Sequence, residues 1–275
     1  MPEVLMSKPA KISVRDLHKS FGPKVVLDGM SLDVAAGESL VVIGGSGTGK
    51  SVLLKHIIGL LRPDSGTVEV DGVAVEKLGN REITDFRRKF GMSFQEGALF
   101  DSMTIWQNVA FPLQRLTKMS RKEIDERVKE CLDLVHLEGV EEKLPSQLSG
   151  GMRRRVGFAR AISHRPEILL FDEPTTGLDP VTTALIGEVI VELNDELKTT
   201  TVTITHDMES AFRIGDRIAM IHRGRLVASA PPEEFRTLQD PRVQQFIHGR
   251  AEGPLSDEPG VRTGTWPGQP KTPGR

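Results

Sequence analysis

The 275-residue sequence has little cysteine, few aromatic side chains and no long apolar run. Its single cysteine, Cys131, has no partner within the chain for a disulfide, which fits a reducing compartment. Tyrosine is absent, so any aromatic side chain that stacks on a ligand must be Phe or Trp. The most apolar stretches, such as Ser39–Ile43 and Ile168–Phe171, are far shorter than the roughly 20 residues of a membrane-spanning helix. We therefore expect any membrane role to require a partner.

Neither sign of charge is in clear excess. The 36 Lys and Arg residues and 38 Asp and Glu residues leave a net charge of −2, so no overall positive field is available to hold a polyanion. We therefore expect no nucleic-acid partner. Residues 1–10 also lack the apolar run behind a basic stretch that marks a secretory signal, so we expect a cytoplasmic protein.

Short apolar runs rich in β-branched residues alternate with helical patterns along most of the chain. This alternation is typical of an α/β fold with a largely parallel sheet. The region at about 104–162 differs, because Ile124, Val128, Cys131 and Val135 recur at helical spacing there, which predicts a helical insertion. The runs expected to form strands are Lys11–Asp16, Val25–Val34, Leu40–Ile43, Thr67–Val70, Phe90–Phe94, Ile168–Phe171, Thr201–Thr205 and Arg217–Ile221.

A glycine-rich loop lies between a predicted strand, Leu40–Ile43, and an apolar helical pattern that begins at Val52. It has the form G-x-x-x-x-G-K-[ST], in which backbone N–H groups and the N-terminus of the following helix hold phosphate oxygens. We expect Lys50 to reach the β- and γ-phosphates of a nucleotide and the Ser51 hydroxyl to ligate Mg²⁺. The residues of this phosphate loop are Gly44, Gly45, Ser46, Gly47, Thr48, Gly49, Lys50 and Ser51.

Two adjacent acidic residues, Asp172 and Glu173, end the apolar run Ile168–Phe171. Such a run suits a strand buried on both faces, whose carboxyl end is where α/β sheets bind ligands. Alternation along a strand points the two side chains in different directions, so they can have different roles. We expect Asp172 to hold Mg²⁺ through water and Glu173 to orient or deprotonate an attacking water.

The segment Leu148–Met152 reads Leu-Ser-Gly-Gly-Met and resembles the LSGGQ signature of ABC ATPases, with Met152 in place of Gln. It precedes Asp172 by the interval usual in that family. The residues alone support a binding role, because Ser149 is suited to cap a helix that begins near Gly150. The free N–H groups of that helix can receive an anion.

Four further positions resemble those of ABC ATPases in the same order. Gln95 resembles the glutamine that contacts Mg²⁺ and the attacking water, and His206 resembles the histidine that contacts the γ-phosphate. Asp179, in Gly177–Asp179, resembles the aspartate of the D-loop. Phe21 stands where the family has an aromatic residue that stacks on adenine.

The resemblance covers residues 12–224 and implies the ABC ATPase form of the P-loop NTPase fold. That fold has a mostly parallel sheet core, an antiparallel β subdomain and an inserted helical subdomain, here within a nucleotide-binding domain at 11–250. It implies ATP and Mg²⁺ as cofactors. Because the chain has one phosphate loop and one signature, it also implies a homodimer. Each ATP would lie between the phosphate loop of one chain and Ser149, Gly150 and Gly151 of the other.

Within the family, the segment Phe94–Ser102 and the signature with Arg153–Arg155 most resemble the ATPases of Mla-type lipid transporters. This resemblance implies an integral membrane permease, an MCE-domain lipid-binding protein and a small cytoplasmic regulatory subunit as partners. It also implies a position on the cytoplasmic face of the inner membrane. The segment follows Gln95, where such ATPases receive the coupling helix of a permease, and we expect the arginines to face solvent or another subunit.

Three other functions share parts of this pattern. An ATPase of an importer for amino acids or another polar solute has every one of these motifs, so it stays an alternative. A translation-type ABC protein normally carries two cassettes, and a chromosome-maintenance ATPase needs a long heptad region; neither is present. Residues 251–275 contain ten Gly or Pro residues, which predicts a tail that is disordered or ordered by a partner.

Overall fold

The computed structural model describes residues 10–95 and 97–256. Its centre is a six-stranded sheet in the order β10-β9-β3-β8-β7-β6, in which every neighbouring pair is parallel except β10 and β9. The strands are β3 (Ser39–Ile43), β6 (Phe90–Ser93), β7 (Ile168–Asp172), β8 (Thr200–Ile204), β9 (Arg217–His222) and β10 (Arg225–Ala230). The predicted parallel α/β core is confirmed.

A second sheet is antiparallel and has the order β2-β1-β4-β5. Its two long strands, β1 and β2, pair along almost their whole length through several register shifts. The strands are β1 (Ala10–Phe21), β2 (Lys24–Ala35), β4 (Ser65–Val70) and β5 (Val73–Ala74). This sheet is the antiparallel subdomain that the resemblance implied.

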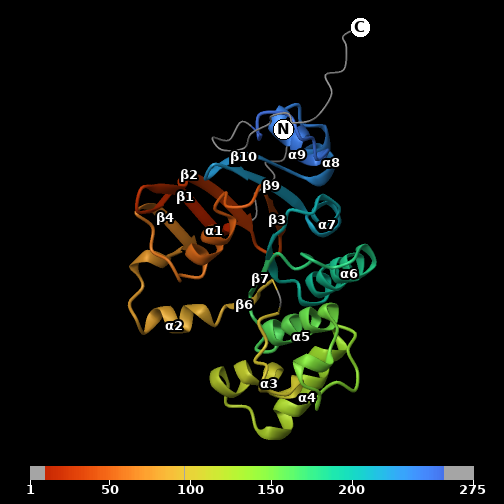
Figure 1. The fold of residues 1–275 in the computed structure, drawn as a ribbon. Helices are drawn as coiled ribbons and strands as arrows, with labels where there is room; N and C mark the ends of the chain where they lie inside the picture. The colour runs from red at the N-terminus through yellow and green to blue at the C-terminus, as the bar shows by residue number, and fades with distance from the viewer. Residues whose placement is uncertain (1–9, 96, 257–275) are drawn as a thin grey trace, which may run out of the picture.

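The helices α3, α4 and α5 form a group at the end of the molecule opposite to α8 and α9 (Figure 1). Two of them begin with capping boxes, Thr104 with Gln107 for α3 and Ser120 with Glu123 for α4. The helices are α1 (Lys50–Ile57), α2 (Glu82–Arg87), α3 (Ile105–Leu116), α4 (Arg121–Asp133), α5 (Gly150–Ile162), α6 (Pro180–Leu197), α7 (Met208–Ile214), α8 (Pro232–Thr237) and α9 (Pro241–Ile247), with 3₁₀ turns at Val75–Lys77 and Pro145–Gln147.

The parallel strands are buried on both faces, and this divides the core into two clusters. Leu40 and Val42 of β3 belong to the cluster shared with the antiparallel sheet and α1, whereas Val41 and Ile43 belong to the cluster shared with α3, α5 and α6. Alternation along each strand causes this division. Cys131 lies in the second cluster and is fully buried, and burial raises the pKa of its thiol to about 12. One face of the central sheet therefore packs against the antiparallel sheet and α1, and the other packs against α3, α5 and α6.

Residues 250–256 fold back onto α9. The buried Gln245 donates hydrogen bonds from its amide to the backbone oxygen of Arg250 and the hydroxyl of Ser256, and its side-chain oxygen accepts one from the backbone N–H of Leu255. Leu255 also packs against the second core cluster. The first six residues of the predicted tail are therefore attached to the domain, and the rest of it, 257–275, lies outside the described residues.

Within residues 10–95 and 97–256, the structure contains no helix that is long and apolar enough to cross a bilayer.

Candidate nucleotide site

Four parallel strands end at the same edge of the central sheet, and each is followed by a predicted site residue. β3 leads into the phosphate loop, β6 precedes Gln95, β7 ends in Asp172, and β8 precedes His206. Carboxyl ends of parallel strands are where α/β sheets bind ligands, so the topology alone gathers these residues.

The phosphate loop turns directly into α1. Gly49 precedes the helix with φ 103°, and a Cβ at this position would lie 2.8 Å from both Leu27 Cδ2 and the backbone oxygen of Val26, so glycine is required. The Lys50 ammonium is buried beneath the loop and donates to the backbone oxygens of Gly44, at 2.7 Å, and Gly45, at 2.9 Å. Burial lowers its pKa below the usual value. The helix N-terminus and this cation provide positive charge for phosphate oxygens.

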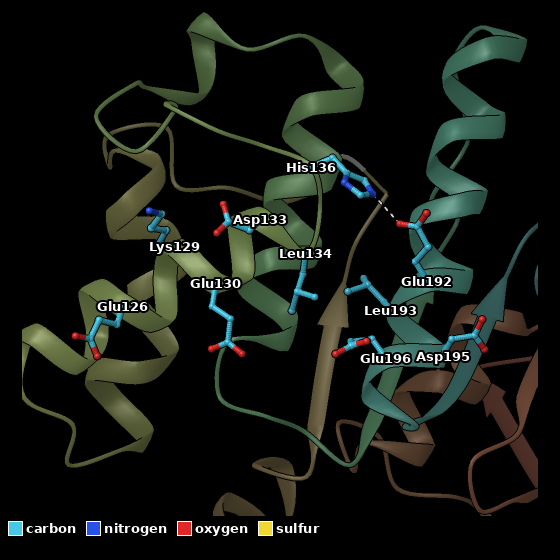
Figure 2. A pocket seen from close by; sticks show the side chains of 10 residues that line it. All are labelled: Glu126, Lys129, Glu130, Asp133, Leu134, His136, Glu192, Leu193, Asp195 and Glu196. Atoms are coloured by element: carbon cyan, nitrogen blue, oxygen red, sulfur yellow. Dashed lines mark hydrogen bonds and ion pairs between the residues drawn. The ribbon is translucent and has the colours of Figure 1, made fainter.

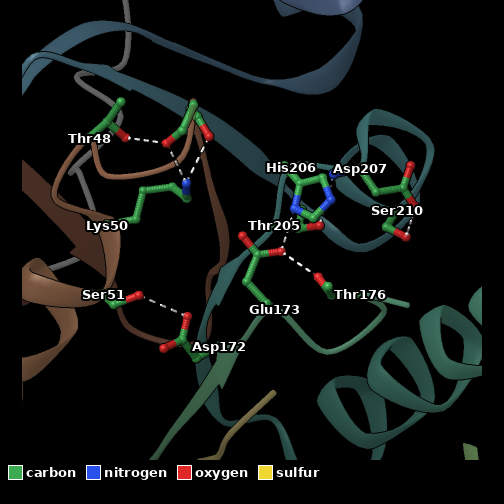
Figure 3. A network of polar contacts seen from close by, with 12 residues as sticks. Thr48, Lys50, Ser51, Asp172, Glu173, Thr176, Thr205, His206, Asp207 and Ser210 are labelled. Carbon is green, nitrogen blue, oxygen red and sulfur yellow. Dashed lines mark hydrogen bonds and ion pairs between the residues drawn. The ribbon is translucent and has the colours of Figure 1, made fainter. Parts of the chain in front are cut away.

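Ser51, in the first turn of α1, and Asp172, at the end of β7, are joined by a hydrogen bond. The Ser51 hydroxyl donates to Asp172 Oδ1 at 3.2 Å (Figure 3). Burial raises the pKa of the Asp172 carboxyl, partly offset by the hydrogen bond from Ser51. Among the described residues, no group of three or more His, Cys, Asp or Glu side chains is arranged to hold a metal. The two oxygen ligands fit Mg²⁺, which favours one or two protein oxygens together with substrate phosphates.

Glu173 has a left-handed backbone, with φ 52°, immediately after β7. Its backbone N–H bonds to the Ile204 oxygen of β8 at 2.9 Å. Its Oε2 accepts from the Thr176 hydroxyl at 2.9 Å and lies 2.7 Å from His206 Nδ1 (Figure 3). A non-glycine residue with this φ costs conformational energy, and such positions concentrate at functional sites. The turn holds the carboxylate beside His206.

Lys50, Ser51, Glu173 and His206 line one cavity of about 500 Å³, and Asp172 is joined to it through Ser51. Phe21 lines a neighbouring cavity of about 290 Å³ together with Gly47, Gly49 and Lys50, and the residue is 48% exposed. An exposed ring beside the phosphate loop suits stacking on a nucleotide base. The first cavity is lined by Ser46, Gly47, Lys50, Ser51, Gln95, Glu173, Thr176 and His206.

The signature and Asp179 line neither of these cavities. Ser149 caps α5, with its hydroxyl accepting from the Met152 N–H at 3.2 Å, and Asp179 caps α6 by accepting from the N–H groups of Val181 and Thr182. The predicted residues therefore fall into two groups. Gln95, Glu173, His206 and Phe21 line the cavities at the phosphate loop, whereas the signature and Asp179 do not.

A wider cavity, of about 810 Å³, lies between α4 and α6 (Figure 2). Leu134 and Leu193 lie among its lining residues, and the ring nitrogen of His136 lies 2.6 Å from a Glu192 oxygen across it. Its acidic residues would repel the phosphates of a nucleotide, so we assign the nucleotide to the phosphate loop. The acidic lining residues are Glu126, Glu130, Asp133, Glu192, Asp195 and Glu196.

Sequence reasoning missed two polar residues at the site. Thr176 contacts Glu173 directly, and its position three residues after the acid in a short turn was the available signal. Arg154 is buried, 7% exposed, and donates to the backbone oxygens of Gln95 and Thr176. The prediction that Arg153–Arg155 face solvent or another subunit is therefore wrong for Arg154, because its position on α5 turns it inward.

Comparisons with known proteins extend this geometry. A family model described as "ABC transporter" matches residues 27–176. A protein of Mycobacterium leprae described as "Probable ribonucleotide transport ATP-binding protein mkl" is 44% identical over 89% of this chain and 70% of its own length. The phospholipid transport ATP-binding protein MlaF of Haemophilus influenzae is 38% identical over 89% of this chain and 92% of its own. The methionine import ATP-binding protein MetN of Carboxydothermus hydrogenoformans is 48% identical over 84% and 69%.

A solved structure of an ATP-binding cassette is similar over 80% of this chain and 98% of its own, with a TM-score of 0.74 and 34% identity. Its description is that of a dimer in a post-hydrolysis state, bound to ADP and Pi. The relatives have three different named substrates, so the resemblance to Mla-type ATPases is one of several. This chain belongs to the ABC transporter family and is an ABC ATPase, which binds and hydrolyses ATP.

Proposed function

We propose that this chain powers a permease that moves phospholipids between bacterial membranes. The observation that carries the proposal is the segment Phe94–Ser102, which resembles that of Mla-type ATPases and follows the end of β6. Similarity to MlaF along nearly the whole length of that protein supports it. Because the cargo of a transporter contacts the permease rather than the ATPase, the segment that meets the permease is the relevant one to compare.

The same segment presents apolar side chains to solvent. Phe94 and Phe100 are 42% and 43% exposed, and the Phe100 ring packs against Phe111 at 5.0 Å. The guanidinium group of Arg160 lies over the Phe100 ring, and that of Arg115 lies over the Phe111 ring. Exposed aromatic side chains with neighbouring arginines are typical of interface centres, so this surface suits the coupling helix of a permease. The chain would then lie at the cytoplasmic face of the inner membrane.

We further propose a homodimer with two composite ATP sites. One chain supplies the phosphate loop, Gln95, Asp172, Glu173 and His206, and the other supplies the signature. The separation of the signature from the phosphate-loop cavity supports this arrangement, as does the dimeric description of the similar cassette. The nucleotide-binding domain spans 11–250 in this proposal, with 104–162 as its helical part.

Each side chain then has a physical role. Lys50 and the N–H groups of the phosphate loop hold the β- and γ-phosphates, and Phe21 stacks on adenine. Bound Mg²⁺ would neutralise charge on the phosphates, with Ser51, Gln95 and Asp172 as its protein ligands. Two further residues, Glu173 and His206, would contact the reacting groups.

Glu173 orients the attacking water and accepts its proton, while His206 contacts the γ-phosphate. Asp179 would contact the nucleotide across the interface, and Ser149, Gly150 and Gly151 would close the site from the partner chain.

An importer of amino acids or another polar solute is the second candidate. The 48% identity to a methionine import ATP-binding protein favours it, and the catalytic residues are compatible with either cargo. The two candidates differ in the subunits that accompany the ATPase. An MCE-domain protein and a small cytoplasmic subunit would accompany a lipid transporter, whereas a periplasmic solute receptor would accompany an importer.

Purification of the transporter from membranes distinguishes them. The chain carries an affinity tag, and mass spectrometry identifies the proteins and lipids that copurify with it. We expect a permease, an MCE-domain protein and enriched phospholipids. Recovery of the permease with a solute receptor, and without an MCE-domain protein, would refute the lipid proposal and support a polar solute as the cargo.

A further inference from the structure

The helix that begins with the signature, α5, packs directly on the segment that follows Gln95. A Cβ at Gly157 would lie 2.9 Å from Gly97 Cα, and a Cβ at Gly97 would lie 2.8 Å from the backbone oxygen of Arg153. The backbones therefore touch without a side chain between them. Arg160 adds hydrogen bonds to the backbone oxygens of Gly97, at 2.6 Å, and Ala98, at 2.9 Å. Because close-packed interiors transmit displacement, we expect α5 and this segment to move together.

Arg154 extends this contact to a second loop. It lies one turn into α5 and is buried, and its Nε donates to the backbone oxygen of Gln95 at 2.9 Å. Its terminal nitrogen donates to the backbone oxygen of Thr176. One guanidinium thus joins the loop after β6 to the loop after β7. The rigid fork of donors in arginine suits two acceptors on different segments, whereas the single ammonium of lysine does not.

The second loop leads directly to Glu173. The same Thr176 whose backbone oxygen is held by Arg154 donates its hydroxyl to Glu173 Oε2 at 2.9 Å. Its backbone N–H also bonds to the Glu173 oxygen at 3.4 Å. A displacement of Arg154 therefore changes the position of Gln95 and of the Glu173 carboxylate together.

We propose that Arg154 is a positioning residue that couples the two ATP sites of the dimer. The proposal rests on the composite dimer proposed above. Ser149–Gly151 of this chain contact ATP held by the partner, and Arg154 on the same helix holds the Gln95 and Glu173 loops of this chain's own site. Engagement of α5 at one site thereby sets the geometry of hydrolysis at the other. Arg154 itself contacts no reacting atom.

Steady-state hydrolysis by the purified full-length chain tests this coupling. The variants are Arg154→Lys and Arg154→Gln, with Arg155→Gln as the matched control. Arg155 lies on the same helix, is also partly buried, and donates to the backbone oxygens of Val135 and His136, away from the site. The readouts are kcat, the KM for ATP, the Hill coefficient and the thermal unfolding temperature.

We expect both Arg154 variants to lose about 10- to 100-fold in kcat, the range that a misplacement of about 1 Å produces. The KM should stay within about 2-fold, because the phosphate loop is unchanged, and the Hill coefficient should fall toward 1. Arg155→Gln should keep the Hill coefficient and kcat of the unmodified chain. Equal effects of Arg154 and Arg155 variants on all four readouts would overturn the proposal, as would a fall in kcat with an unchanged Hill coefficient.

Thr176→Val provides a second variant that leaves Arg154 in place. It removes only the hydroxyl that holds Glu173, and we expect the same fall in kcat at constant KM. The double variant with Arg154→Lys should lose less than the product of the two single losses, because both act on one carboxylate. Multiplicative losses would refute a shared path.

Ser149→Arg separates this inference from the proposed dimer. Full activity of that variant would refute the composite site itself. An inactive Ser149→Arg, together with Arg154 variants that behave as Arg155→Gln does, would refute only the coupling.

Discussion

The loops at the sheet edge and the signature at the start of α5 differ in what their side chains contact. At the sheet edge, Glu173 lies 2.7 Å from His206, and Ser51 bonds to Asp172 at 3.2 Å. At the start of α5, the Ser149 hydroxyl bonds to its own helix. The first region gathers polar side chains of one chain around a cavity, whereas the second is the capped N-terminus of a helix, which can receive an anion. The difference supports the proposed composite sites, in which one copy holds halves of two different sites.

Replacement of Glu173 tests the sheet edge and has the largest expected effect. Glu173→Gln keeps the shape of the side chain but removes the proton acceptor, so we expect turnover to fall by roughly 10²- to 10⁴-fold. ATP binding should be retained, because the phosphate loop is intact, and ATP should trap a closed dimer. Phosphate release and size-exclusion chromatography with ATP measure both effects. Unchanged turnover would remove Glu173 from the mechanism.

Replacement of Ser149 tests the other region. The long cation in Ser149→Arg would block the approach of a partner's nucleotide, so we expect hydrolysis to fall by about 10²-fold, as when a stabilising donor is lost. ATP binding by the phosphate loop should change little in equilibrium titrations. The exposed Ser146, three residues earlier, gives the control Ser146→Arg, which should remain active. Loss of ATP binding in Ser149→Arg would place the signature at the chain's own phosphate loop and remove the distinction between the regions.

Asp172 offers a smaller effect that concerns stability. Burial raises the folded-state pKa of its carboxyl above the unfolded value. A raised carboxyl pKa favours the folded state at low pH, and this contribution is lost as the pH rises through the folded-state pKa. At pH 7 the charge is therefore a cost, and we expect Asp172→Asn to raise the unfolding temperature by about 2–4 °C, the shift for about 1 kcal/mol in a domain of this size.

Thermal unfolding without nucleotide, at pH 7 and at a pH below 4, checks this sign. The gain should shrink at the lower pH, because both forms are then neutral. A lower unfolding temperature for Asp172→Asn at pH 7 would contradict the stated cost. Hydrolysis by this variant should be lost, since the carboxylate is the proposed metal ligand.

Thiol labelling of Cys131 gives the smallest expected effect, and it tests the helical part of the chain that carries the signature. Its thiol is buried in α4 with a pKa of about 12, so it stays protonated at pH 8 and out of contact with reagents. We expect no reaction with a thiol reagent in the folded protein and one equivalent after unfolding. Rapid reaction in the folded protein would show that the helical part opens readily, and would weaken the view of α5 as a rigid link.

Residues that bind phosphate could be predicted because the chemistry requires particular side chains at short, fixed spacings. The phosphate loop, Asp172 and Glu173 are of this kind. Arg154 and Thr176 are not, because the contact of Arg154 with Gln95 spans 59 positions and depends on how α5 packs. No local pattern around Arg154 distinguishes it from the neighbouring arginines.

The fold was predictable where apolar runs are continuous, and less so elsewhere. β10 was missed because its run of small residues is weakly apolar. The turn before it carried a usable signal in Gly224, because two-residue turns between antiparallel strands favour glycine; in the structure, Arg223 and Gly224 have the positive φ of such turns, 48° and 71°. The attachment of residues 251–256 to the domain was missed because composition gives no sign that Gln245 holds them.

Cross-linking between the two regions tests the central claim most directly. One chain carries Ser46→Cys in the phosphate loop, a second carries Ser149→Cys in the signature, and both carry Glu173→Gln; the buried Cys131 is not expected to interfere. The two chains are mixed with ATP and treated with a short thiol cross-linker. The account predicts a cross-linked dimer only in the mixture and only with ATP. A further variant carries both new cysteines in one chain. A cross-link within that chain, together with no cross-linked dimer in the mixture, would contradict the account.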